Sequence, residues 1–268
     1  VSPGLVGVLY GLSNIASDGG ATRADVWLPV LAGLALLAAF AIAQLRRPDA
    51  ALVDLQLLRQ RPVAASSVVL FLSGAALYGS MLLLPLFFQI VRGADVLSAG
   101  LLLIPQGLGA LASRALAGRL TDTVGARVVA MCGFAVLGLA TIPFAVADAG
   151  TSTWWLMLVL LVRGFGSGAV MIPVMSVAFV GLQRADVPHA SIITRLAQQL
   201  GGAFGTALLA VILDAAATGA TTVAGYALAF DTAFWWAVGF TAVAVLVSLV
   251  LPTAAVPMVS RDAAPAPR

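Results

Sequence analysis

The sequence predicts an all-α polytopic membrane protein, and its composition is the first reason. The chain has 268 residues, of which 61% are hydrophobic and only 9% are charged, whereas soluble domains carry about 25% charged residues. A chain with so few charged side chains cannot cover its own surface in water. The second reason is that apolar residues form continuous runs of about 20, the length that a helix needs to cross a bilayer. These runs do not alternate with polar residues, so helices are expected instead of strands.

The apolar runs, counted in chain order, predict one incomplete span that ends near Ile15, followed by seven complete spans. The complete spans are expected at 27–45, 63–91, 97–117, 128–147, 154–180, 192–213 and 232–251. The run 63–91 is long for one crossing and contains Pro85, and a tilted or kinked helix accommodates both features.

The first residue is Val1, and the apolar stretch after it is typical of the second part of a spanning helix. We therefore expect the chain to be the C-terminal portion of a longer protein. The predicted organisation is the end of a helix over 1–15, a linker helix with an interfacial linker over 16–62, a six-helix unit over 63–251, and a disordered tail over 252–268.

Arginines lie almost entirely on one side of the predicted spans. Eleven fall in alternate connections and the C-terminal tail, two fall in the other connections, and Arg163 lies inside a span. The eleven are Arg46, Arg47, Arg59, Arg61, Arg114, Arg119, Arg127, Arg184, Arg195, Arg261 and Arg268. Because short loops rich in basic residues stay in the cytoplasm, we expect a cytoplasmic C-terminus, with Arg23 and Arg92 on the opposite side.

One charged stretch, GRLTDTVGAR, separates two spans on the predicted cytoplasmic side. Its glycines, Gly118 and Gly125, permit a tight turn. Asp122 is expected near the start of the next helix, where a carboxylate accepts hydrogen bonds from free N–H groups. Arg119 and Arg127 can pair with it or with neighbouring helix ends. The stretch is either a gate element or a solvated turn whose arginines set the topology.

A second signal is the sequence LVRGFGSGAV, which places Arg163 near the middle of a span. An arginine there costs about 2.5–3.5 kcal/mol unless it faces a cavity or a partner. Arg163 is therefore either a structural residue that bridges helices or a charge that faces a transport cavity. Gly164 and Gly168 form a small-xxx-small pair, and we expect them to serve helix packing.

A smooth glycine face is also expected on the fifth span of the six-helix unit, where Gly201, Gly202 and Gly205 follow one another closely. Polar or soft side chains in other spans are candidates to line a substrate path, although helix packing or lipid contact would explain each of them as well. These candidates are Gln89, Gln106, Tyr78 and Met81.

Several classes of function are excluded by what the sequence lacks. It shows no nucleophile–base constellation and no phosphate-binding loop. Cys132 is its single cysteine, so neither a disulfide framework nor a metal cluster is expected. No basic run is interleaved with aromatic residues, so we expect no nucleic-acid partner. We therefore predict a protein that is not an enzyme and holds no metal.

The charged stretches resemble motifs of the major facilitator superfamily. GRLTDTVGAR is similar to the signature Gly-x-Leu-Ala-Asp-x-x-Gly-Arg-Arg/Lys, which joins the second and third helices of each six-helix half of that fold. Gly118, Leu120, Asp122 and Gly125 match, whereas Ala126 stands where a basic residue is usual. LVRGFGSGAV resembles the Arg-x-x-x-Gly motif of the fourth helix, which in the N-terminal half is associated with proton coupling.

Two further segments are similar to the fourteen-helix drug:proton antiporter branch of this superfamily. QQLGGAFG resembles an Arg-Gln-x-Gly-Gly-x-x-Gly segment of the penultimate helix, with Gln198 and Gln199 in the Arg-Gln place. PDAALVDLQLLRQRP is similar to the linker after the eighth helix of that branch. The resemblance implies the C-terminal six-helix half of the fold, preceded by linker helices.

The resemblance implies a secondary transporter that exports small apolar or amphiphilic compounds, such as drugs and antibiotics, by proton-coupled alternating access. A proton gradient would supply the energy without a cofactor, and the titrating residue would lie in the missing N-terminal half. The implied partners are membrane lipid, a small-molecule substrate and that missing half, in the cell membrane of a bacterium. The alternatives are a solute importer, a dedicated metabolite exporter, and a truncated remnant that does not transport.

Overall fold

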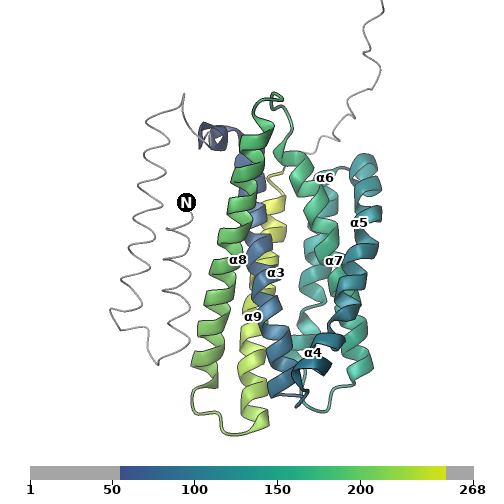
Figure 1. Cartoon of the computed structure of the whole chain (residues 1–268), viewed down its shortest axis with the longest axis vertical. Coiled ribbons are helices and arrows are strands. Elements are labelled where there is room, and N and C mark those ends of the chain that lie inside the picture. The colour runs from purple at the N-terminus through teal and green to yellow at the C-terminus, as the bar shows by residue number, and fades with distance from the viewer. Residues whose placement is uncertain (1–54, 252–268) are drawn as a thin grey trace, which may run out of the picture.

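The computed structural model describes residues 55–251, which form a bundle of long, roughly parallel helices (Figure 1). The elements are η2 (Leu55–Arg59), α3 (Arg61–Ile90), α4 (Val96–Leu102), α5 (Ile104–Val124), α6 (Ala126–Leu139), η3 (Ile142–Val146), α7 (Thr153–Ala178), α8 (Val187–Ala217) and α9 (Val223–Ser248). The predicted helix end over 1–15, most of the linker over 16–62 and the tail over 252–268 lie outside the described residues.

Six helical segments of the described range are long and apolar enough to cross a membrane. They are Arg61–Ile90, Val96–Val124, Ala126–Val146, Thr153–Ala178, Val187–Ala217 and Val223–Ser248. This confirms the prediction of an all-α polytopic fold. Several boundaries differ from the predicted ones because a helix can continue past the end of its apolar run. For example, α9 begins nine residues before the predicted position 232, where the Thr222 hydroxyl accepts a hydrogen bond from the Gly225 backbone N–H at 3.2 Å.

The second span is interrupted near its start. Leu103 ends α4 and also precedes α5, whose first turn contains Pro105. A proline lacks the backbone N–H and clashes with the carbonyl four residues earlier, which breaks the helix there. By contrast, α3 continues through Pro85 as one helix of 30 residues.

The structure corrects the expectation that GRLTDTVGAR is a turn as a whole. Helix α5 continues to Val124, so Gly118, Arg119 and Asp122 lie on that helix. The chain reverses at Gly125, with φ 89° and ψ 151°, a region that only glycine adopts readily. One glycine is enough for the reversal, and Asp122 therefore lies in the last turn of α5 instead of at the start of α6.

The first three spans (α3, α4–α5 and α6) and the last three (α7, α8 and α9) form two triplets, and the first helix of each triplet packs on the second and third helices of the other. Helix α3 packs most extensively on α8 and next on α9, while α7 packs most extensively on α5 and next on α6. The helices α6 and α9 also contact each other. Because each triplet contains three crossings, the second triplet enters the membrane from the side opposite to the first. The arrangement is an inverted repeat of the kind found in secondary transporters.

Five phenylalanine rings form the centre of the core at the α4 end of the bundle. Phe87 and Phe88 from α3 meet Phe144 from η3, and Phe230 and Phe234 from α9 complete the cluster. The ring of Phe87 stands edge-on to that of Phe230, with centroids 5.7 Å apart. Such edge-to-face pairs contribute about 0.5–1.5 kcal/mol each beyond the burial of area, so this cluster holds the first, third and sixth spans together.

Candidate functional site

A glycine-lined crossing brings the backbones of α5 and α7 into direct contact. A Cβ atom added to Gly164 would lie 1.9 Å from the carbonyl oxygen of Gln106, and one added to Gly168 would lie 2.3 Å from that of Ala110. Gly109 on α5 faces the backbone of α7 in the same way, at 2.0 Å. These positions therefore have no room for any side chain.

The crossing that the internal repeat makes equivalent joins α3 to α8. A Cβ atom on Gly201 would lie 1.9 Å from the carbonyl oxygen of Phe71, and one on Gly205 would lie 2.4 Å from the backbone of α3. Gly202 lies against the ring of Tyr78, which a Cβ atom would approach to 2.5 Å. The five glycines assigned to packing by sequence thus lie at two matching crossings.

Other glycines at these contacts were missed by the sequence analysis. Gly74 on α3 faces the backbone of α8, and at a third contact Gly133 on α6 faces Gly166 on α7. A signal was available for Gly109, which has the small residue Ser113 four positions later. For Gly74 and Gly133, the sequence does not indicate which neighbouring helix packs against the glycine.

Arg163 on α7 is 1% exposed and lies inside the bundle. Its Nε donates to the hydroxyl of Thr141 at 3.0 Å, and that hydroxyl donates to the carbonyl oxygen of Leu137 at 2.7 Å. Its Nη1 is buried and has no hydrogen-bond partner among the described residues. Arg163 thus bridges α7 to the end of α6, while its Nη1 stays without a partner among the described residues. Lining of a transport cavity stays a prediction for this residue.

The other candidate cavity residues are distributed over two helices. Tyr78 and Met81 are exposed one turn apart on α3, and Gln89 is half-buried near the end of that helix. Gln106 lies on α5 opposite Gly164, and its side-chain oxygen is buried without a partner in the described range. The structure therefore brings Tyr78 and Met81 together and places Gln106 at the other crossing.

Of the charged residues predicted to form a gate, Arg127 makes a tertiary contact. Its Nε donates to the carbonyl oxygen of Leu251 at 2.7 Å, which ties the start of α6 to the chain just after α9. Arg119 and Asp122 are exposed on α5, and neither side chain makes a hydrogen bond or ion pair within residues 55–251. Gly118 also faces open space.

A second arginine contact lies at the opposite end of the bundle and was missed by sequence reasoning. Arg92, after α3, donates to the backbone oxygens of Asp148 and Thr151 and to the hydroxyl of Thr153. The carboxylate of Asp148 accepts hydrogen bonds from the Thr151 hydroxyl and the Gly150 N–H, each at 2.9 Å. These bonds, that of Thr151 foremost, hold the pKa of Asp148 below its usual value. Arg92 therefore fixes the connection before α7.

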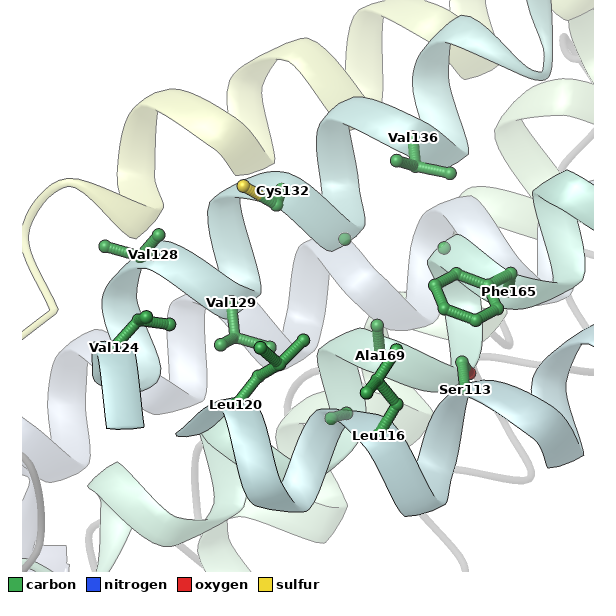
Figure 2. Close-up of a pocket in the computed structure, with 13 residues that line it drawn as sticks. Ser113, Leu116, Leu120, Val124, Val128, Val129, Cys132, Val136, Phe165 and Ala169 are labelled. Carbon is green, nitrogen blue, oxygen red and sulfur yellow. The ribbon is translucent and has the colours of Figure 1, made fainter. Parts of the chain in front are cut away.

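An apolar cavity of about 220 Å³ lies between α5, α6 and α7 (Figure 2). Leu116 and Leu120 line it from α5, Val128 and Cys132 from α6, and Phe165 from α7. None of the candidate substrate residues predicted from the sequence lines this cavity.

Comparison with known proteins places this bundle in a family. Residues 1–206 match the model of the Major Facilitator Superfamily. The multidrug resistance protein B homolog of Mycobacterium tuberculosis is 34% identical over 215 residues, which cover 80% of this chain and 40% of that protein. The tetracycline resistance determinant of Streptomyces rimosus is 33% identical over 188 residues, which cover 70% of this chain and 54% of that protein.

A third relative is the lincomycin resistance protein LmrB of Listeria innocua, which is 29% identical over 212 residues, or 79% of this chain and 45% of that protein. The chain thus spans about half or less of the length of these relatives. The family model matches more than half of the chain, and the helices form the inverted repeat described above. The chain is a multi-pass membrane protein that belongs to the major facilitator superfamily.

Proposed function

We propose that this chain is part of a transporter that exports small apolar or amphiphilic compounds, among them antibiotics, across a bacterial cell membrane. The observation that carries this proposal is its similarity, over most of its length, to proteins named for multidrug, tetracycline and lincomycin resistance. Those relatives are longer than this chain, so the exporter would include residues beyond those present here.

The packing of the bundle supports a second bundle as its partner. The spans that contain α5 and α8 have the smallest buried fractions of the six within the described residues. Their free faces carry exposed apolar side chains, including Leu108 and Leu111 on α5 and Phe204 on α8. These surfaces suit an N-terminal half of the proposed exporter, and rocking of two such halves about a central site is the basis of alternating access.

The two glycine crossings support this mechanism as well. Helices whose backbones touch cannot slide without clashes, so the pairs α5–α7 and α3–α8 would move as stiff units. In this proposal the C-terminus lies in the cytoplasm, and a proton gradient supplies the energy through a titrating residue in the other half.

Drug accumulation in cells tests the proposal. The full-length protein is expressed in a drug-sensitive bacterium that lacks its main efflux pumps, and cellular ethidium and tetracycline are measured with and without a protonophore. We expect accumulation to fall several-fold, with the difference abolished by the protonophore. Unchanged accumulation would contradict export, and a gradient-dependent increase would identify an importer.

A further inference from the structure

The cavity between α5, α6 and α7 is an open groove that runs along the bundle, here called the lateral groove. Figure 2 shows Val124 and Val128 at one of its ends and Val136 and Phe165 at the other. Val124 and Val128 flank Gly125, on the predicted cytoplasmic side, whereas Phe165 lies in the middle of the α7 span. The lateral groove therefore extends from the membrane surface towards the bilayer centre.

Small residues line the inner wall of this groove. They are Ala117 on α5, Ala169 on α7, and Gly133 and Gly166 where α6 and α7 are in close contact. Helices α5 and α6 also contact each other less extensively than α8 and α9, the equivalent pair of the second triplet. The looser contact between α5 and α6 is thus a departure from the internal repeat.

The lining suits hydrocarbon and does not suit water. Ser113 supplies a hydroxyl, but that hydroxyl donates to the carbonyl oxygen of Ala110 at 3.1 Å. An apolar cavity of about 150 Å³ already stays dry and binds a benzene-sized ligand. The lateral groove is larger, at about 220 Å³, so an apolar chain is the occupant that its chemistry favours.

The groove is continuous with the membrane-facing surface of the bundle. Leu116, Val124 and Val128 form its rim and are themselves exposed aliphatic side chains. Because the three helices around it belong to spanning segments, this rim lies at the depth of the bilayer. The stretch 114–127 beside its predicted cytoplasmic end contains three arginines and one aspartate. This positive excess complements a negatively charged headgroup.

We propose that the lateral groove binds an acyl chain of an anionic membrane phospholipid. The headgroup lies near Arg119 at the predicted cytoplasmic surface, and the chain descends past Cys132 towards Phe165. The bound chain replaces the side-chain packing that α5 and α6 lack between them. This site is independent of what the protein transports.

Photo-crosslinking tests the proposal on the full-length protein in lipid nanodiscs. The probe is phosphatidylglycerol with a diazirine in one acyl chain, and adducts are located by peptide mass spectrometry. Val243 on α9 serves as the reference, since it is about as exposed as Val128 (47% against 43%). It lines neither the lateral groove nor a second cavity, which lies between α6 and α9. We expect adducts on Val128 and Cys132 to exceed those on Val243 about five-fold or more.

Two matched variants separate the groove from general lipid contact. Leu116→Trp fills the groove, whereas Leu228→Trp adds the same volume at an exposed position on α9 outside it. We expect the first to remove the excess of adducts and the second to leave it unchanged. Equal labelling of Val128 and Val243, or an excess that survives in Leu116→Trp, would overturn the site.

Competition between the probe and unlabelled lipids tests the site in the protein without any substitution. Unlabelled phosphatidylglycerol should displace the probe from Val128 and Cys132 at a lower mole fraction than phosphatidylcholine with the same chains. Equal displacement by the two lipids would overturn the preference for an anionic headgroup. Absence of adducts throughout the groove would mean that another part of the transporter covers it, which also overturns the proposal.

Discussion

The guanidinium Nε of Arg127 donates a hydrogen bond to the carbonyl oxygen of Leu251 over 2.7 Å, although the two residues are 124 positions apart in the chain. Leu251 follows the end of α9, where backbone oxygens have no partner within the helix. The bond therefore joins the first turn of α6 to the end of the sixth span. The sequence left Arg127 to pair either with Asp122 or with a neighbouring helix end, and in the structure its partner is the end of α9.

Replacing Arg127 by alanine should lower the free energy of unfolding by about 1–2 kcal/mol, because a hydrogen bond from a charged donor is lost. Arg127→Lys keeps the charge but not the directional N–H of the guanidinium, and we expect it to recover only part of the loss. Thermal stability in detergent, followed by fluorescence-detected size-exclusion chromatography, measures both. Equal stability of all three proteins would show that the bond contributes nothing.

Thr141 should tolerate serine and not valine. Thr141→Val leaves the buried Nε of Arg163 without its acceptor, which costs about 1–3 kcal/mol or more for a charged group. Thr141→Ser keeps the hydroxyl and serves as the matched control. The same thermal assay distinguishes them, and a valine variant as stable as the serine variant would contradict the bridging role of Arg163.

A single methyl group should separate α5 from α7. Gly164→Ala places a Cβ atom 1.9 Å from the Gln106 carbonyl oxygen, and such overpacking costs about 1–3 kcal/mol or more. Gly107→Ala, on α5 at a position with nothing within 4 Å, is the control. We expect Gly164→Ala to reduce the yield of monodisperse protein and Gly107→Ala to leave it unchanged. Similar yields would mean that the helices can move apart without penalty.

The two glycines of the GRLTDTVGAR stretch should respond oppositely to alanine. Gly118 lies inside α5 with open space around it, so Gly118→Ala should stabilise the protein by about 0.5–1 kcal/mol. Gly125 has φ 89°, and Gly125→Ala should destabilise it by about 1–3 kcal/mol. Melting temperatures measured side by side test the pair. A loss of stability in Gly118→Ala would indicate that this position is packed.

Asp122→Asn should reduce transport without reducing stability. The carboxylate is exposed and makes no hydrogen bond or ion pair within the described residues, so its removal costs nothing in this conformation. If the residue stabilises another conformer of the transport cycle, accumulation of substrate in cells will rise while expression and melting temperature stay constant. Unchanged accumulation would remove the gate role from Asp122.

The fold was predictable because its signals are local. A run of apolar residues defines a span by its own length. The motif around Asp122 lies between two spans, at the place where the superfamily carries its signature. Both can therefore be recognised without tertiary information. The all-α membrane fold and the superfamily were therefore predicted correctly. The fourteen-helix branch and the cytoplasmic C-terminus stay predictions.

The contacts that the sequence did not predict depend on how segments far apart in the chain pack against one another. The role of Arg92 requires that the end of α3 lie beside the connection before α7, more than 50 residues later. Arg163 was recognised as a buried charge, but its turn towards Thr141 depends on how α6 and α7 pack. The continuation of α5 to Val124 was missed because polarity marks the edge of the membrane and not the end of a helix.

Few substitutions are tolerated at the two glycine crossings. Any other residue at Gly164 or Gly201 would place its Cβ atom against a backbone carbonyl oxygen. Exposed side chains such as Tyr78 and Met81 carry no such constraint from their helix backbones. Selection for a new substrate would therefore act on these exposed positions and leave the crossings unchanged. Among relatives, the exposed residues that contact substrates would therefore change faster than the glycines that hold the helices together.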